Sequence, residues 1–437
     1  MMKEIELNND ESMDKTCNLD GNPKVGWLCN KHGLLLKTYR WLSKNAAGII
    51  LLIHGYRFHI RLTFMRTNLK IPNHNESFVV DSNTYYIYKD SWIEKFNQSG
   101  YSVYGIDLQG HGESQSWKNV NGDFSRFDDL VDDVIQYMNQ IHDEISNENQ
   151  TDGESYDIVS TKKKRLPMYI IGYSMGANIA LRILQLLNKE KEDKIKTYNS
   201  NNYKKCSIML NNSTDVNEID NDMHNMNNSK YGDPGTSSGS TSATISGIVS
   251  TSGKHEGCYN DLDKFNIKGC ISLSGMIRIK LKYDPGNKSY TYFYLPIINF
   301  LSYILPNLQN LLEPHNEKSG YFSNICKYYI FRNINGKKYK YMYELAKATV
   351  TLDYNINYMP KDIPLLFVHS QDDSICSYEW AVAFYNKVNV SKKELYPVDG
   401  MDHNITTNPG NEEILKKVID WISDVRSNDE DGKENEL

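Results

Sequence analysis

The chain has 437 residues, 39% of them hydrophobic, and a net charge of −6, which suits one large domain or two average ones and argues against a nucleic-acid-binding protein. Its seven cysteines are widely spaced with no Cys-x-x-Cys pair, which indicates reduced thiols rather than a disulfide framework or a zinc site. The N-terminus lacks an apolar signal region and no apolar run reaches the roughly 18 residues of a membrane span, so we expect a cytoplasmic protein.

Apolar runs of strand length alternate with segments of helical spacing along the chain. Two short runs, at 27–29 and 34–41, predict antiparallel edge strands. The later runs are continuously apolar, which is typical of strands covered on both faces of a parallel sheet. Helices are predicted at 127–141 and 177–187 between them. The long runs are 48–53, 102–107, 168–172, 268–274, 364–369 and 394–398, and together they predict an α/β fold.

Three segments depart from this alternation. Residues 188–263 are rich in Asn, Ser, Gly and Lys without an apolar period, which predicts a disordered low-complexity insertion; a binding role for it stays open. Residues 276–358 are apolar and aromatic and are broken by prolines, which favours a helical cap over plain core helices. Residues 426–437 are charged and predict a disordered tail.

The strongest motif is Gly172-Tyr173-Ser174-Met175-Gly176, which matches G-x-S-x-G between a predicted strand and a predicted helix. So sharp a turn needs small residues on both sides of the serine, because bulky side chains would clash there. It also holds the hydroxyl near the positive end of a helix. The motif predicts that Ser174 is a nucleophile, and a glycine-rich turn without chemistry is the alternative.

A serine nucleophile needs a base and an orienting acid, which follow it in the order Ser, Asp, His in this architecture. The predicted strand at 364–369 ends at the paired aspartates Asp372 and Asp373, of which we favour Asp373. The loop after the last strand carries His403, the expected base. Asp402 beside it is interpreted as a solvated loop residue.

The developing oxyanion needs two hydrogen-bond donors. One is expected from the backbone N–H of Met175 and the other from that of Tyr56, which follows His54-Gly55 at the end of an early strand. Asp107 and His111 in "GIDLQGHGES" supply only two metal ligands, and there is no GxGxxG or Walker lysine. We therefore expect structural hydrogen bonds from this pair, and no metal or cofactor.

The segments "LLIHG", "GIDLQGHGES", "GYSMGANIAL", "HSQDDSIC" and "GMDHNI" together resemble the monoacylglycerol lipase and lysophospholipase-like branch of the α/β-hydrolase superfamily. The stretch "YIYKDSWIEKFNQSGYSVYGIDLQGHGES" is especially similar to the PST-A subgroup of parasite lysophospholipase-like and esterase-like proteins. The similarity covers residues 25–187 and 264–425, which form the expected hydrolase domain.

The resemblance implies an α/β-hydrolase fold with a mostly parallel sheet, flanking helices and a helical cap. It assigns Ser174 as nucleophile, Asp373 as acid and His403 as base, with the N–H groups of Tyr56 and Met175 as the oxyanion hole. The implied function is that of a serine hydrolase of monoacyl lipid esters, active in lipid degradation. The alternatives are a small-ester carboxylesterase, a thioesterase or an aminopeptidase of the same fold, and a non-catalytic binding protein on a hydrolase scaffold.

Two features bear on the substrate. The lipases usually carry a small residue and then Glu-His after the His-Gly pair, whereas this chain has Tyr56 and Arg57 and keeps only His59. We expect Tyr56 and Arg57 to narrow or re-charge the acyl site. The apolar, aromatic residues 292–308 of the cap predict a long acyl chain and a transient contact with a membrane surface.

Overall fold

The computed structural model describes residues 19–67, 86–117, 122–151, 165–211, 262–280, 286–305 and 338–434. The chain divides into two units, one of Met1–Lys191 with Tyr259–Leu437 and the other of Glu192–Cys258. Within the described residues, the second unit is the C-terminal part of one long helix. The site developed below lies wholly in the first unit.

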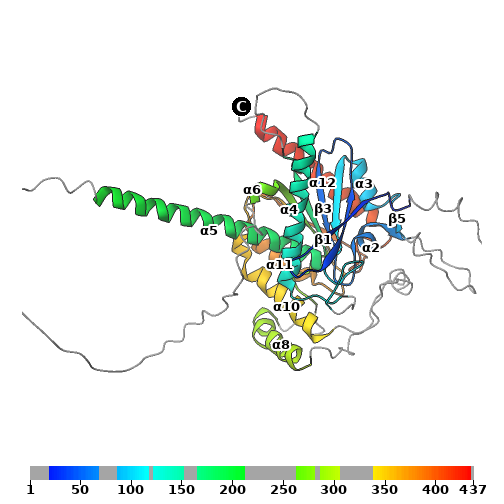
Figure 1. The fold of residues 1–437 in the computed structure, drawn as a ribbon. Helices are drawn as coiled ribbons and strands as arrows, with labels where there is room; N and C mark the ends of the chain where they lie inside the picture. The colour runs from blue at the N-terminus through cyan, green and yellow to red at the C-terminus, as the bar shows by residue number, and fades with distance from the viewer. Residues whose placement is uncertain are drawn as a thin grey trace, which may run out of the picture. The chain divides into compact units, whose positions relative to one another are not determined.

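A central sheet of eight strands organises the first unit (Figure 1). Its spatial order is β1-β2-β6-β3-β7-β8-β9-β10. The pairs β1–β2 and β2–β6 are antiparallel and all the others are parallel, which confirms the predicted α/β class and the predicted edge strands. The strands are β1 (Lys24–Cys29), β2 (Leu35–Trp41), β3 (Gly48–Ile53), β6 (Tyr101–Ile106), β7 (Met168–Tyr173), β8 (Ile267–Leu273), β9 (Leu365–Ser370) and β10 (Lys393–Val398).

The helices and the remaining short strands fall between these strands. A small two-stranded sheet pairs β4 (Arg66–Thr67) with β5 (Tyr86–Ile87). The helices are α2 (Ile60–Phe64), α3 (Trp92–Gln98), α4 (Phe127–Thr151), α5 (Met175–Asn211), α6 (Leu262–Phe265), α7 (Gly286–Ser289), the π-helix η1 (Tyr290–Tyr294), α8 (Leu295–Ile304), α10 (Tyr339–Tyr354), the 3₁₀-helix η2 (Ile356–Tyr358), α11 (Tyr378–Lys387) and α12 (Asn411–Glu434).

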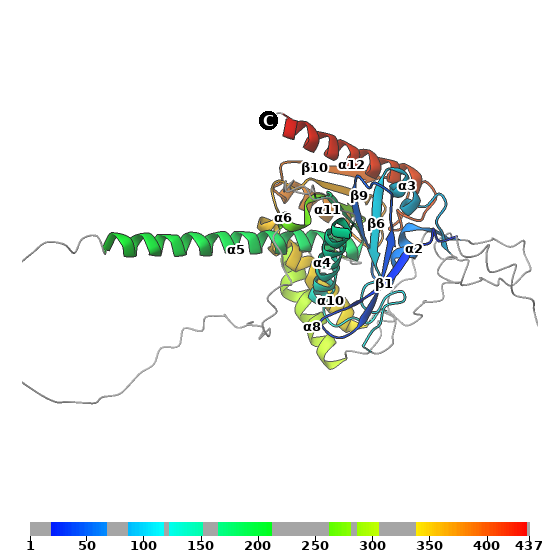
Figure 2. The same cartoon turned by 45° about the horizontal axis from the view of Figure 1, so that its top comes forward.

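Helices cover both faces of the sheet, which explains why its central strands are continuously apolar. Every residue of β3, β6, β7 and β9 is buried. Ile49, Leu51 and Ile53 point into a core shared with α4, α5, α10 and α11. Ile50 and Leu52 point into a second core shared with α2, α3 and α12, on the other face (Figure 2).

The structure corrects two predicted boundaries. The insertion expected from residue 188 begins later, because α5 continues to Asn211. Lys and Glu are good helix formers, and Lys196 Nζ lies 3.7 Å from Glu192 Oε2, one helical turn earlier. The polar composition of this segment is therefore compatible with a continued helix. Residues 212–261 of the insertion lie outside the described residues. The tail expected from residue 426 is helical through Glu434, and Lys268 pairs with Asp429 at 2.9 Å.

The segment expected to form a cap contains α7, η1, α8, α10 and η2, and its residues 306–337 lie outside the described residues. Helix α10 is attached to the core of the first unit by polar contacts. Glu344 accepts a hydrogen bond from the backbone N–H of Phe127 at 2.9 Å, and Gln185 donates to the carbonyl oxygen of Leu352 at 2.9 Å. No helix within the described ranges is both long and apolar enough to cross a membrane.

Candidate active site

Ser174 stands in the turn between β7 and α5, with its backbone in the left-handed region at φ +53°. This conformation is strained for a residue with a side chain. The flanking glycines are required by space: a Cβ on Gly172 would lie 2.3 Å from the carbonyl oxygen of Gly176, and a Cβ on Gly176 would lie 2.3 Å from that of Ile53. The turn therefore has the sharpness that a G-x-S-x-G nucleophile elbow needs.

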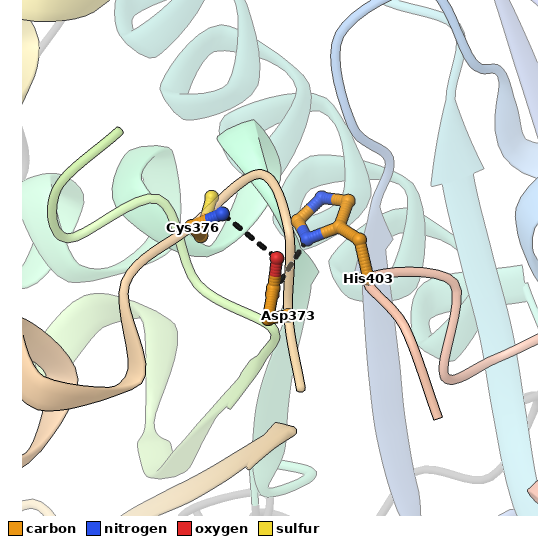
Figure 3. A group of neighbouring side chains, drawn as sticks. All are labelled: Asp373, Cys376 and His403. Carbon is orange, nitrogen blue, oxygen red and sulfur yellow. Dashed lines mark hydrogen bonds and ion pairs between the residues drawn. The ribbon is translucent and has the colours of Figure 1, made fainter. Parts of the chain in front are cut away.

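The structure brings together the three side chains that the sequence singled out, from the carboxyl ends of three strands. His403 Nε2 lies 2.8 Å from Ser174 Oγ. On the other side of the ring, His403 Nδ1 lies 2.7 Å from Asp373 Oδ2, as Figure 3 shows for these two side chains. All three residues are buried, with exposed fractions of 9% for Ser174, 6% for His403 and 0% for Asp373, so the carboxylate is the most deeply buried group of the three. We call these three residues the strand-end site.

Asp373 is held as a carboxylate by the donors around it. Its Oδ1 accepts hydrogen bonds from the backbone N–H groups of Ile375 and Cys376, both at 2.8 Å. His369 Nε2 lies 3.3 Å from Oδ2, beside His403. Burial by itself raises the pKa of Asp373, but the charge of His403 and the hydrogen bonds from His369 and His403 bring that pKa well below the ordinary value. The acid therefore stays ionised at neutral pH.

The neighbouring aspartates have other roles. Asp372 is exposed and accepts a hydrogen bond from the backbone N–H of Gly400 at 3.0 Å. Asp402 accepts from the backbone N–H of Ser374 at 2.8 Å and from that of His403 at 2.7 Å, so it ties the loop of the acid to the loop of the imidazole. Asp402 is therefore a structural link, and not only the solvated loop residue that the sequence predicted.

The loop after β3 passes directly over Ser174. A Cβ on Gly55 would lie 3.1 Å from Ser174 Cβ, so a larger residue at position 55 would crowd the serine. The next residue is Tyr56, and Met175 is the first residue of α5, whose opening N–H groups have no partner within a helix. Both predicted oxyanion donors thus belong to segments adjoining the serine.

His54 fixes the loop that carries Tyr56. Its Nδ1 lies 2.8 Å from the carbonyl oxygen of Gly55, and its Nε2 accepts from the backbone N–H of Leu108 at 2.9 Å. Both contacts are satisfied by a neutral ring protonated at Nδ1. Complete burial, and then the proximity of His111, lower the pKa of His54 well below its usual value. These contacts give His54 a structural role in the loop.

Asp107 and His111 also lie beneath this loop in hydrogen bonds, as predicted. Asp107 accepts from the backbone N–H of Ile60 at 3.0 Å and from that of Glu113 at 3.2 Å, and burial raises its pKa to about 6. His111 Nδ1 lies 2.8 Å from the carbonyl oxygen of Gln109, and burial lowers the pKa of this imidazole to about 4. The pair supports the loop without reaching the serine by any described contact.

The side chain of Tyr56 is enclosed by aromatic rings. Its ring centroid lies 5.7 Å from that of His111, 6.2 Å from that of Phe124 and 6.4 Å from that of Tyr341 on α10. The guanidinium of Arg57 lies 5.4 Å from the Tyr56 ring. Tyr56 therefore connects the loop after β3 to α10 through its contact with Tyr341.

Sequence reasoning missed two supports of the strand-end site. His369 lies in β9, before the acid in sequence, and is the second imidazole at Asp373. Tyr173 donates its hydroxyl hydrogen to Asn404 Oδ1 at 2.8 Å, and its ring centroid lies 5.4 Å from that of His403. A tyrosine at the variable position of the motif gave no signal of this contact, because its partner is 231 residues away.

Comparison with known proteins agrees with this architecture. Residues 83–197, which include Ser174, match the family model described as serine aminopeptidase, S33. No curated protein matches the chain. Among solved structures, a soluble variant of monoglyceride lipase from Saccharomyces cerevisiae is similar with a TM-score of 0.54 and 13% identity, over 92% of this chain and 95% of that one. A lipase in an open form is similar with a TM-score of 0.50 and 12% identity, over 92% and 99%. These likenesses show a common fold.

Proposed function

We propose that this chain, which has an α/β-hydrolase fold, is a serine hydrolase that cleaves the carboxylic esters of monoacyl lipids. The observation that carries the proposal is the continuous hydrogen-bonded chain from Ser174 Oγ through the His403 imidazole to Asp373, with contacts of 2.8 and 2.7 Å. A serine on a strained elbow, a base within hydrogen-bond reach and a buried acid behind the base are the parts of a triad.

The mechanism follows from the roles of these groups. His403 Nε2 takes the proton of Ser174 as the oxygen attacks the ester carbonyl, and the ionised Asp373 stabilises the imidazolium that forms. The N–H groups of Met175 and Tyr56 hold the oxyanion. His403 then gives its proton to the leaving alcohol and activates the water that hydrolyses the acyl-enzyme.

The choice of a monoacyl lipid rests on the surface of η1 and α8. Large apolar side chains are exposed along this stretch, and no charged residue lies between Tyr290 and Leu305. So large an apolar surface is typical of protein or lipid contact sites. We assign to it a transient contact with a membrane surface by an otherwise cytoplasmic protein. The side chains, together called the apolar stripe, are Tyr292, Phe293, Ile297, Phe300, Tyr303 and Ile304.

A fluorophosphonate probe tests the nucleophile. We expect the wild-type protein to be labelled and Ser174→Ala to remain unlabelled, because the probe needs an activated serine. Ser114→Ala is the matched control, since Ser114 is bound to the Asp107 carbonyl oxygen outside the strand-end site and its loss should leave labelling intact. Absence of labelling in the wild type, or equal labelling of Ser174→Ala, would contradict the proposal.

A substrate panel then tests the lipid assignment. We expect kcat/KM to be highest for long-chain lysophospholipids or monoacylglycerols and lower for acetyl and butyryl esters and thioesters. A peptide amide belongs in the panel because the matched family model is described as a serine aminopeptidase. A peak on short esters would move the assignment to a carboxylesterase, and a peak on the amide to an aminopeptidase.

A further inference from the structure

The acid and base of the strand-end site share their surroundings with a thiol. Asp373, Cys376 and His403 each offer a ligand atom, and these atoms all lie within 4.8 Å of one another. All three residues are buried, and Figure 3 shows Asp373 and Cys376 on the loop after β9 beside His403 on the loop after β10. The backbone N–H of Cys376 holds Asp373 Oδ1, so the loop geometry that orients the acid also fixes the position of the thiol.

We propose that this group is an inhibitory binding site for a soft divalent cation, with Zn²⁺ as the best fit. One sulfur, one imidazole nitrogen and one carboxylate oxygen form a ligand set that zinc commonly uses in proteins. Calcium and magnesium require several oxygen ligands, and the group supplies one carboxylate. A thiolate and a carboxylate also neutralise the two charges of the ion, which favours its entry into a buried site.

The ligand atoms must move only slightly to accept the ion. His403 Nδ1 and Asp373 Oδ2 are now hydrogen-bonded at 2.7 Å. Ligands about 2.0–2.3 Å from one zinc ion stand roughly 3.3–3.7 Å apart in a tetrahedron, so this pair opens by less than about 1 Å while the sulfur closes in. Of the residues around the group, Ser174 and His403 keep small exposed fractions, 9% and 6%, whereas Asp373 and Cys376 are at most 1% exposed.

Binding would stop the reaction by removing the base, and this consequence rests on the proposed function. The Cys376 thiol releases its proton to solvent and binds as the thiolate. The proton on His403 Nδ1 transfers through solvent to Nε2, so that Nδ1 can bind the ion with the ring still neutral. Nε2 then carries a proton where it must accept one from Ser174. The carboxylate that stabilises the imidazolium is bound to the ion as well.

Zinc binding and serine reactivity are measured separately on the full chain after treatment with a chelator. Competition with a chromophoric zinc chelator gives the number and strength of sites, and the rate of fluorophosphonate labelling gives the state of Ser174. We expect micromolar zinc to slow labelling and hydrolysis together, and equal concentrations of Mg²⁺ or Ca²⁺ to change neither. Cys376→Ser should bind zinc at this site at least about tenfold more weakly than wild type. Its labelling and hydrolysis should therefore slow only at correspondingly higher zinc concentrations. The rates of each variant are normalised to its own metal-free rate.

Cys29→Ser is the matched control, because Cys29 is the exposed thiol of the described residues and its loss should leave the inhibition unchanged. Equal zinc inhibition of Cys376→Ser and wild type, or inhibition that disappears only in Cys29→Ser, would overturn the proposal. If circular dichroism shows that Cys376→Ser is unfolded, His403→Asn removes a different ligand and must lose the same zinc site in the chelator assay. Failure of metal-free wild type to be labelled would refute the proposed function alone, since zinc binding is read without turnover.

Discussion

The strand-end site and the apolar stripe are held in opposite ways. Asp373 is fully buried and is surrounded by two backbone N–H groups and two imidazoles. In the stripe, Tyr303 is 88% exposed and Phe300 is 63% exposed, on helices whose inward residue Ile298 is 6% exposed. The first region is fixed by directional contacts, and the second keeps its apolar area available. We infer that changes in the first affect turnover, whereas changes in the second affect how a lipid reaches the serine.

The largest effect should follow from removing the charge behind the base. Asp373→Asn keeps the size of the side chain but cannot hold His403 in the required tautomer, so we expect kcat to fall by about 10⁴-fold. Asp372→Asn is the neighbouring control. It should change kcat little, because Asp372 is exposed and its carboxylate accepts a hydrogen bond from the backbone N–H of Gly400. Steady-state kinetics on a soluble ester measures both. A larger loss of kcat in Asp372→Asn than in Asp373→Asn would make Asp372, and not Asp373, the acid behind His403.

A smaller loss should follow from removing one oxyanion donor. Tyr56→Pro deletes the backbone N–H, for which we expect kcat to fall by about 10²–10³-fold with KM much less affected. Tyr56→Phe keeps the N–H and the aromatic contacts with Phe124 and Tyr341, so its kcat should stay near that of wild type. If kcat fell equally in both variants, the side chain of Tyr56, and not its backbone N–H, would carry the effect.

The apolar stripe should give an effect that depends on how the substrate is presented. Phe300→Ser with Tyr303→Ser removes exposed apolar area, so we expect about tenfold weaker binding to phosphatidylcholine vesicles and a similar loss of activity on vesicle-borne monoacyl lipid. Activity on a soluble short ester should be unchanged, as should the melting temperature. Trp117→Ser is a matched control, since Trp117 is also exposed (53%) but lies outside the stripe. An equal loss of activity on the soluble ester would contradict the proposal that the apolar stripe affects only how the lipid reaches the serine.

Much of this arrangement could be predicted from sequence because it depends on local patterns. Continuous apolar runs predicted the buried strands. The order of Ser174, Asp373 and His403 along the chain was enough to predict that the strand ends carrying them lie close together. Residues 188–211 and 426–434 are helical where we expected disorder, because their polar composition indicated disorder although Lys and Glu favour helices.

The supports that sequence reasoning missed depend on contacts between distant parts of the chain. Tyr341 on α10 donates to Asp123 in the loop before α4, and Tyr173 meets Asn404, and neither pair has a local sequence signature. A single sequence shows which residues are apolar or reactive. It does not show which of its many tyrosines will meet a given buried oxygen.

The smallest predicted effect compares Asp373 with a second buried carboxylate, Asp133 on α4. Both are at most 1% exposed, but Asp133 Oδ2 accepts one hydrogen bond, from Asn30 at 3.2 Å, and burial raises its pKa to about 7. Since this pKa lies above the ordinary value of 3.8, the folded state binds a proton that the unfolded state has released, and stability is lost as pH rises from 3.8 through about 7.

Asp133→Asn removes this titration while keeping an oxygen that can accept from Asn30. We therefore expect the melting temperature of the variant to exceed that of wild type by a few degrees at pH 8, and the gap to shrink steadily toward pH 4. Asp143→Asn, at an exposed position of the same helix, should follow wild type at every pH. A constant gap between Asp133→Asn and wild type would mean that packing, and not the proton, separates them.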